Sequence, residues 1–385
     1  MTHEHEQTDH DDLPITHEVR LTLRQWLAAL LTVTLIAVAL PRAWKHVERF
    51  EVGADYRIPY ALSNDYWLFD WYLQKVAAAK PIVVLGDSVV WGEYVKADGT
   101  LPHFLNAEAA KPVRFVNAGV NGLFPLAMEG LVRDYGTALH DRKVIVVCNL
   151  LWLTSPKADM QAESDETINH TPLIPQFRPK VPSYQADATT RIGAVIGRHV
   201  SLMGWVNHLQ SAYFNQRSVT QWTLAEDPDH PRSYPNAYRN PLARITCVVP
   251  SGQLDDLERG EGSSRHKPWS SEGPRKTAFD WVPLSSSLQW AAFQRTVEML
   301  RHRNNDVLVI VAPFNEHMIA DPSQDAYKST QSGIVAWLSE NHIPFVLPDK
   351  LPSEIYADAS HPLTAGYALL ADTIVKSEPF QKWMR

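Results

Sequence analysis

The chain has 385 residues, of which 45% are hydrophobic and 21% charged, and this composition indicates a globular protein with an extensive core. Its formal net charge is -7 and the sequence builds no basic stripe, which argues against a nucleic-acid partner. Two cysteines, Cys148 and Cys247, are too few for a disulfide framework or a zinc site, and a single bridge between them stays open at this stage.

The N-terminal part divides into a polar tail and an apolar segment. Residues 1–20 are acidic and contain several histidines, which predicts a solvated tail. Residues 21–41 include an uncharged apolar run, and as a helix of about 1.5 Å per residue they would cross the roughly 30 Å hydrocarbon core of a bilayer. We predict a single transmembrane signal anchor. A cleaved signal peptide is the alternative, because Ala37-Val38-Ala39 resembles a small-residue cleavage site.

Basic residues flank both ends of this anchor, so the positive-inside rule does not set its orientation. We expect the catalytic part to lie outside the cytoplasm, in the periplasm, because an enzyme acting on cytoplasmic solutes needs no anchor. Residues 42–80 are predicted to link the membrane to the catalytic domain. Within them, residues 64–73 have the pattern of a capped amphipathic helix.

From residue 81 to residue 385, apolar runs alternate with helical segments, which predicts βαβ units and a parallel sheet in an α/β domain. The predicted strands are 82–85, 113–117, 144–148, 307–312 and 344–347. The predicted helices are 99–110, 126–139, 287–303, 324–341 and 363–378.

Residues 152–286 interrupt that alternation. They contain a helical pattern over 190–214 and then a long tract rich in proline, and a structureless loop of this length is uncommon unless it is functional. We predict an inserted lid or subdomain that lies over the carboxyl ends of the strands. Trp222, Trp269 and Trp281 are candidates for stacking on sugar rings, with ordinary packing as the alternative.

The stretch from Pro81 to Gly92 is the one around which the domain is organised. It reads as a buried strand followed by Gly86, which permits a turn, and then by Asp87 and Ser88. In open α/β sheets, ligand sites lie outside the carboxyl ends of the strands, so Ser88 is a candidate nucleophile at the start of a helix. The alternative is that Asp87 and Ser88 only cap that helix.

This stretch resembles the first sequence block of the SGNH (GDSL-type) hydrolases, and two later stretches match further blocks of that family. The matching residues are Gly86-Asp87-Ser88 with Gly92, then 117–122 after a second apolar run, then Asp358 and His361 followed by Gly366-Tyr367. The resemblance covers residues from about 80 to 150 and from about 305 to 375. It implies a three-layer α/β/α, flavodoxin-like domain that carries out serine-dependent ester chemistry.

The resemblance implies a catalytic triad of Ser88, His361 and Asp358. A serine hydroxyl is a weak nucleophile unless a base takes its proton, and His361 is the candidate base. Asp358 lies three residues earlier, so a short loop can fold its carboxylate back onto the imidazole and fix the tautomer. Pro362 disfavours the helical conformation for His361, which predicts an extended segment before the last helix pattern.

The resemblance also implies an oxyanion hole made by the N–H of Ser88, a glycine N–H and an asparagine side chain. Gly122 is the best match for the glycine and Gly119 is the runner-up. The family's usual Gly-x-Asn-Asp pattern is missing from this chain, and Asn149, directly after the third predicted strand, is the candidate donor in its place. If Asn149 does not serve, Asn121 is the substitute.

A further polar cluster, Asn315, Glu316 and His317, follows the fourth predicted strand. Asn315 or His317 is predicted to contact substrate, and Glu316 with His317 is an alternative base pair. The sequence contains no phosphate-binding loop, no dinucleotide fingerprint and no Cys or His cluster with metal spacing, so we predict chemistry without a cofactor or a metal ion.

Together these features predict a membrane-anchored serine esterase acting on O-acyl groups, such as acetyl esters on an extracytoplasmic glycan. An O-acyltransferase with the same triad, acting on an envelope polysaccharide, is the first alternative. A non-catalytic glycan-binding or assembly protein on the same scaffold is the second. The expected partners are an acylated carbohydrate or a small ester and the membrane, and the sequence does not identify the substrate, the oligomeric state or any envelope-complex partner.

Overall fold

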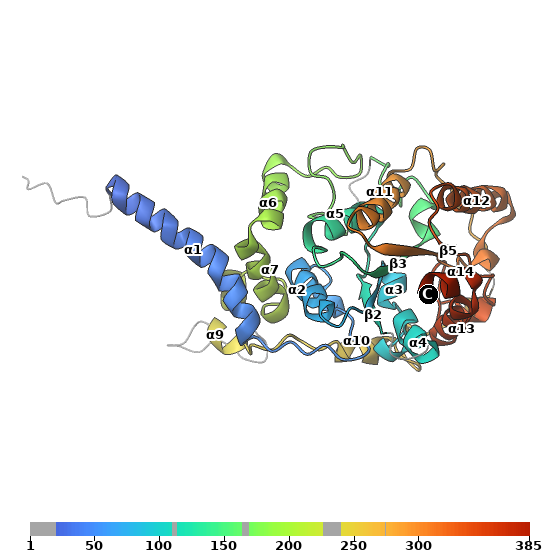
Figure 1. Ribbon diagram of the computed structural model, residues 1–385, viewed down its shortest axis with the longest axis horizontal. Coiled ribbons are helices and arrows are strands. Elements are labelled where there is room, and N and C mark those ends of the chain that lie inside the picture. The colour runs from blue at the N-terminus through green and yellow to red at the C-terminus, as the bar shows by residue number, and fades with distance from the viewer. Residues whose placement is uncertain (1–20, 110–113, 164–168, 226–239, 274) are drawn as a thin grey trace, which may run out of the picture.

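The fold is α/β and is built on a parallel sheet. A computed structural model describes residues 21–109, 114–163, 169–225, 240–273 and 275–385, so the predicted tail over 1–20 lies outside the described residues. In the described residues the sheet has five parallel strands in the order β2-β1-β3-β4-β5, which is the flavodoxin-like doubly wound order (Figure 1). The strands are β1 (Ile82–Gly86), β2 (Phe115–Gly119), β3 (Lys143–Cys148), β4 (Asp306–Val311) and β5 (Phe345–Val346).

Two hydrophobic cores cover the two faces of the sheet, because successive side chains of each strand point to opposite faces. Val83, Leu85 and Val146 belong to one core, and Val84 and Ile145 belong to the other. The first face is covered by α2 (Tyr66–Ala77), α5 (Pro125–Tyr135), α11 (Leu288–His302) and α12 (Gln324–Glu340). The second is covered by α3 (Ser88–Trp91), α4 (Leu101–Glu108), α13 (Thr364–Lys376) and α14 (Glu378–Met384). The predicted α/β class with a layer of helices on each face is therefore confirmed.

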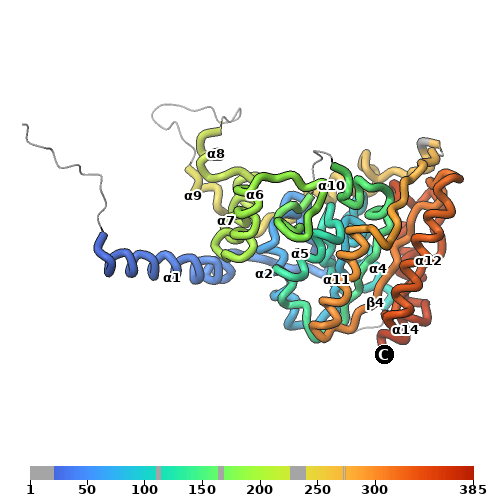
Figure 2. Tube along the Cα trace, turned by 90° about the horizontal axis from the view of Figure 1, so that it is seen from above, coloured from blue at the N-terminus to red at the C-terminus, as the bar shows by residue number. Residues whose placement is uncertain are grey.

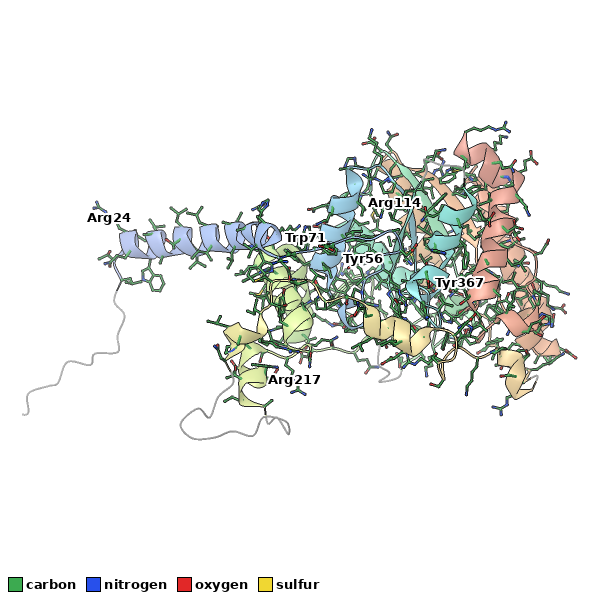
Figure 3. The ribbon with its side chains drawn as sticks, turned by 90° about the horizontal axis from the view of Figure 1, so that it is seen from below. Arg24, Tyr56, Trp71, Arg114, Arg217 and Tyr367 are labelled. Carbon is green, nitrogen blue, oxygen red and sulfur yellow. The ribbon has the colours of Figure 1, made fainter. Side chains whose placement is uncertain are left out.

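The first helix, α1 (Leu23–Val47), extends away from the rest of the protein, and its side chains project into open space (Figures 2 and 3). Its apolar window has a mean hydropathy of 1.8 and no residue of that window is buried. Among the described residues it is the helix that is long and apolar enough to cross a membrane. The helix does not end at the predicted boundary of residue 41 but continues through Pro41, which is buried. Packing holds this extension, since Trp44 contacts the edge of Trp205 with ring centroids 5.7 Å apart.

A buried ionic cluster joins α1 to the domain. His208 of α7 (Ser201–Tyr213) donates through Nε2 to Glu48, which caps α1, and through Nδ1 to Asp65, which caps α2, at 2.8 and 2.6 Å. All three side chains are fully buried. Burial lowers the pKa of His208, but Asp65 and Glu48 outweigh it and raise the pKa to about 10. His208 is therefore protonated at neutral pH.

The segment between β3 and β4 carries its own helices. They are α6 (Ala188–His199), α7, α8 (Val219–Leu224), α9 (Pro241–Arg244) and α10 (Gln253–Arg259). The single helix predicted over 190–214 is wrong, because Val200 has β-region dihedrals and divides it into α6 and α7. Cys148 is buried, Cys247 is partly buried, and both are free, so the bridge left open by the sequence is not formed.

Replacing His208 by Gln should weaken the attachment of α1 to the domain. It removes a cation held between two buried carboxylates, and breaking such a pair costs roughly 3–5 kcal/mol. Since the folded pKa of His208 is raised to about 10, its stabilising contribution is complete below the unfolded pKa of about 6.5 and is lost as the pH rises through 10. The difference in unfolding free energy between wild type and His208→Gln, measured in detergent, should therefore narrow between pH 7 and 10. His199→Gln, at an exposed histidine of α6, is the matched control.

Candidate active site

Ser88 lies at the carboxyl end of β1 and is the first residue of α3. Asp87 caps that helix and accepts a hydrogen bond from the Val89 N–H at 2.9 Å. The turn packs closely on β2, since a Cβ on Gly119 would lie 2.2 Å from the backbone nitrogen of Trp91. Glycine is therefore required there, and the tight approach fixes the position of the serine.

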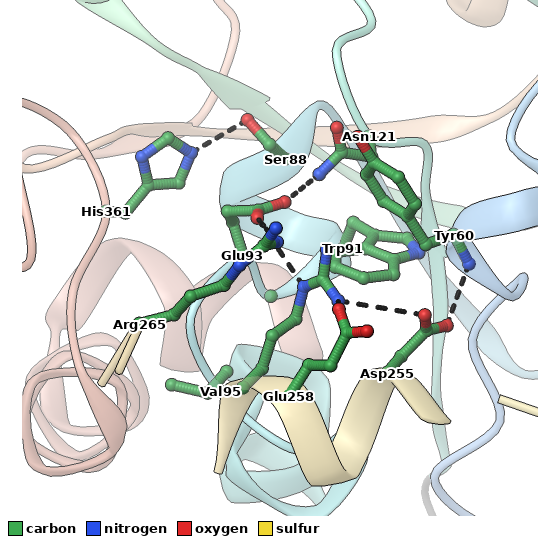
Figure 4. A network of polar contacts seen from close by, with 12 residues as sticks. Tyr60, Ser88, Trp91, Glu93, Val95, Asn121, Asp255, Glu258, Arg265 and His361 are labelled. Carbon is green, nitrogen blue, oxygen red and sulfur yellow. Dashed lines mark hydrogen bonds and ion pairs between the residues drawn. The ribbon is translucent and has the colours of Figure 1, made fainter. Parts of the chain in front are cut away.

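Ser88, His361 and Asp358 form a hydrogen-bonded chain. The Ser88 hydroxyl lies 2.8 Å from His361 Nε2 (Figure 4), and His361 Nδ1 lies 2.8 Å from each carboxylate oxygen of Asp358. The backbone N–H groups of Ser360 and His361 both donate to Asp358 Oδ1 at 2.9 Å. The structure thus brings together the three residues of the predicted triad, and their catalytic role stays a prediction.

A short loop folds the acid onto the base. Tyr356 and Pro362 form an antiparallel bridge, and the Ala357 N–H donates to the His361 carbonyl at 2.8 Å. Asn315 braces the same loop, because its backbone N–H donates to the Ala359 carbonyl at 2.8 Å and its side chain to the Asp358 carbonyl at 3.1 Å. Asn315 is fully buried, so the structure gives it a scaffolding contact where the sequence predicted contact with substrate.

Electrostatics adjust both members of the acid–base pair. Burial raises the pKa of Asp358, but His361 and the two backbone N–H groups outweigh it and bring that pKa to about 2. Burial lowers the pKa of His361, and Asp358 more than compensates, so the net shift is upward. Tyr94 covers the imidazole edge-on with ring centroids 5.4 Å apart. The site therefore holds an ionised carboxylate against a shielded, strengthened base.

Asp87 is the acceptor at the centre of a second cluster. Its Oδ2 accepts hydrogen bonds from the Asn149 amide at 2.8 Å and from the Trp152 indole N–H at 3.0 Å. Burial raises the pKa of Asp87, while Asn149 and His361 counteract that effect. One of the two N–H groups of the Asn149 amide is thus engaged by Asp87 and not by a reacting oxygen. The sequence did not identify Trp152, since a single tryptophan after a strand carries no recognisable pattern.

Backbone groups are better placed than side chains to form the predicted oxyanion hole. Gly122 has a φ of +72° in a turn closed by the Leu123 N–H to the Val120 carbonyl at 3.2 Å. In the part of the chain that the structure describes, neither the Ser88 N–H nor the Gly122 N–H donates a hydrogen bond. The Gly119 N–H, in contrast, donates to Asn117 at 2.9 Å. The side chain of Asn121, the substitute donor, donates to Glu93 (Figure 4).

The other residues singled out by the sequence have structural contacts. His317 lies 3.0 Å from the Leu351 carbonyl, and Glu316 accepts from the Tyr327 hydroxyl at 3.1 Å. Trp281 is buried and packs edge-on against Phe314, so the packing alternative holds for it. Trp222 packs on Phe214, and the backbone N–H of Trp269 donates to Tyr356. Among the described residues, no group of three or more His, Cys, Asp or Glu side chains is arranged to hold a metal ion.

Helix α10 of the inserted segment lies beside the β1–α3 turn (Figure 4). Its Asp255 accepts from the Tyr60 N–H at 2.8 Å and its Asp256 from the Ala97 N–H at 2.9 Å. Arg259 is 1% exposed, and its Nε lies 3.5 Å from the carboxylate of Glu93. The sequence gave no signal for this contact, because isolated charged residues far apart in the chain have no spacing to recognise.

No model of a known protein family matches this chain, and no curated protein is similar to it in sequence.

The substitution Asp87→Asn tests the buried cluster. Asparagine caps a helix as well as aspartate does, so the loss reports the contacts with Asn149 and Trp152. The new amide group would face two donors, and leaving them unsatisfied should lower the free energy of unfolding by roughly 1–3 kcal/mol. Denaturant unfolding measures the difference, with Asp98→Asn at an exposed carboxylate as the control. Equal stability of the two variants would contradict the assignment.

Proposed function

We propose that the protein is a serine ester hydrolase of the SGNH (GDSL) type that acts on O-acyl groups, such as acetyl esters of a glycan. The observation that carries the proposal is the hydrogen-bonded chain Ser88–His361–Asp358, placed at the carboxyl edge of a parallel sheet in flavodoxin-like order. The spacing of the sequence blocks supports the same assignment.

In this mechanism His361 accepts the proton of the Ser88 hydroxyl as the oxygen attacks the ester carbonyl. Asp358 remains ionised and stabilises the imidazolium that forms. The backbone N–H groups of Ser88 and Gly122 are the donors that hold the oxyanion of the tetrahedral intermediate. His361 then returns the proton to the leaving alcohol, and the acyl group remains on Ser88 until an acceptor takes it.

The second candidate is an O-acyltransferase, in which a sugar hydroxyl replaces water as the acceptor. The cover over the site favours it, because Tyr94 shields His361 and α10 is pinned beside Ser88 by buried ionic contacts. Restricting water lengthens the life of an acyl-enzyme. In either case residues 152–286 act as a lid, and α1 anchors the catalytic part on the extracytoplasmic side of a membrane.

Labelling of the full-length protein in detergent with a fluorophosphonate probe tests the nucleophile. Wild type should be labelled, Ser88→Ala and His361→Ala should not be, and Ser218→Ala, at a helix cap remote from the triad in sequence, should behave as wild type. The labelling rate should rise with pH through the pKa of His361, which Asp358 holds above its usual value. In Asp358→Asn that inflection should move to lower pH, and the rate should fall by roughly 10³–10⁴.

Labelling that persists in folded Ser88→Ala, or a folded wild type that is not labelled, would contradict the proposal. The acceptor is then identified by comparing release of free acetate with acyl transfer to added oligosaccharide.

A further inference from the structure

A cavity of about 800 Å³ lies between the turn at the end of β2, the start of α2 and the inserted helices α6 and α7. Asn121 forms part of its wall and immediately precedes Gly122, the candidate oxyanion donor. His170 holds this wall, since its Nε2 donates to the Asn121 carbonyl at 2.7 Å and its Nδ1 accepts from the Tyr66 hydroxyl at 3.0 Å. The cavity is thus adjacent to the candidate active site, although Ser88 and His361 do not line it.

The lining of the cavity is polar but almost uncharged. Amides and phenols dominate it, including Asn64, Asn169, Asn207, Gln210, Tyr135 and Tyr184. Apart from His170, whose pKa is lowered by burial, Arg198 is the one ionisable basic residue among the described lining residues, and no carboxylate lines the cavity. Arg198 is already occupied, because it lies 3.6 Å from Asp134 and donates to the Ile174 carbonyl at 3.0 Å.

Two glycines of α6 keep one side of the cavity open. Gly193 and Gly197 are one helical turn apart and both line it, and a Cβ on either would meet no described atom within 4 Å. Glycine inside a helix costs about 1 kcal/mol relative to alanine. Close packing does not explain that cost here, since nothing fills the space beside either residue. Room for a ligand does.

We propose that this cavity is a saccharide subsite that binds a neutral sugar unit. Amide and phenol groups can donate to and accept from sugar hydroxyls, while the faces of Trp67 and the tyrosines suit the apolar faces of sugar rings. A charged ligand would find no free counter-ion among the described lining residues. The link to catalysis rests on the proposed function: a glycan seated here would place a neighbouring ester or hydroxyl near Ser88.

Filling the cavity from α6 tests the subsite. The full-length Ser88→Ala protein in detergent is titrated calorimetrically with a panel of short neutral oligosaccharides, namely cello-, manno- and chito-oligosaccharides and a β-1,3-glucan. We expect at least one to bind. Gly193→Phe combined with Gly197→Phe should weaken binding at least ~10-fold without lowering thermal stability, because the new side chains enter open space. Ile192→Phe, at a residue of α6 that is 51% exposed and does not line the cavity, is the matched control.

Two outcomes would overturn the subsite: no binding by any member of the panel, or binding that survives the filling. Binding of a fatty-acyl probe that is lost on filling would overturn its assignment to sugars. Saccharide binding in a protein whose Ser88 is never labelled would leave the subsite standing and remove the esterase, so the two proposals fail separately.

A different observation concerns the outer face of α6. Ile192 and Ile196 are exposed on the side of the helix opposite to the cavity, and Met203 of α7 is also 45% exposed. From Ala188 to Ala225 the chain contains no aspartate or glutamate, although it has 43 acidic residues in all. The segment retains arginines, and α7 packs on the end of α1 through Trp205 (Figure 1).

We infer that this outer face of α6 lies on the surface of the bilayer that α1 crosses. Apolar residues flanked by basic ones, without acidic residues, favour contact with anionic headgroups and the acyl boundary. The packing of α7 on α1 places α6 on the side of the domain that faces the membrane-spanning helix (Figures 1 and 2).

Fluorescence quenching tests this contact in full-length protein reconstituted in nanodiscs. In a Cys247→Ser background, a bimane label on Ile196→Cys should be quenched several-fold more by doxyl-labelled lipid than a label on Ser329→Cys of α12, which is exposed at the far end of the domain. Equal quenching at the two sites would overturn the inference. Disulfide formation between two copies through Ile196→Cys, without quenching, would instead identify a dimer surface.

Discussion

The carboxylate of Asp87 is the group on which the geometry of the candidate site depends. It is buried, and it accepts hydrogen bonds from the backbone of α3, from Asn149 at the end of β3 and from Trp152 beyond it. A buried carboxylate is costly unless its oxygens are satisfied, so these segments are constrained to converge on it. Ser88, the next residue in the chain, is thereby fixed with its hydroxyl directed at His361. The position of the nucleophile is set by its neighbour and not by the nucleophile itself.

The acid–base pair arrives from the opposite end of the chain and is held by a separate device. Asp358 and His361 lie in a loop closed by a bridge between Tyr356 and Pro362, so the pair is assembled locally before it meets Ser88. The hydroxyl of Tyr367 on α13 then donates to the Val89 carbonyl at 2.7 Å, which ties the following helix to α3 (Figure 3). Local assembly followed by one long-range tie reduces the number of contacts that must be correct for the triad to form.

The sequence predicted those parts of the molecule that depend on local patterns. Continuous apolar runs such as Val144–Cys148 identify buried parallel strands, because both faces of such strands are covered. The spacing of Asp358 and His361 also has one local solution, a tight loop. The last predicted strand shrank to Phe345–Val346, since it pairs with β4 over two residues at the edge of the sheet.

Contacts between distant segments could not be predicted in this way. The break at Val200 has no glycine or proline to mark it, and it exists because α7 turns to pack on α1 and α2 through Trp205 and His208. The helix continues past Pro41 for the same reason. Asn149 was correctly placed at a strand end, but which acceptor its amide would meet depends on Asp87, a residue on another strand. Such pairings follow from the fold and have no signature in the sequence.

The inserted segment therefore does more than cover a sheet edge. His208 and Trp205 on α7 attach it to the end of α1, and α10 attaches it to the turn beside Ser88. Between these two attachments, α6 and α7 form one wall of the cavity whose other wall carries Asn121. Any tilt of α1 relative to the domain must pass through the buried His208 cluster, and so it would change the width of the cavity before it reached the triad. The rigidity of that cluster, a protonated histidine between two buried carboxylates, sets the distance between the membrane-side helices and the chemistry.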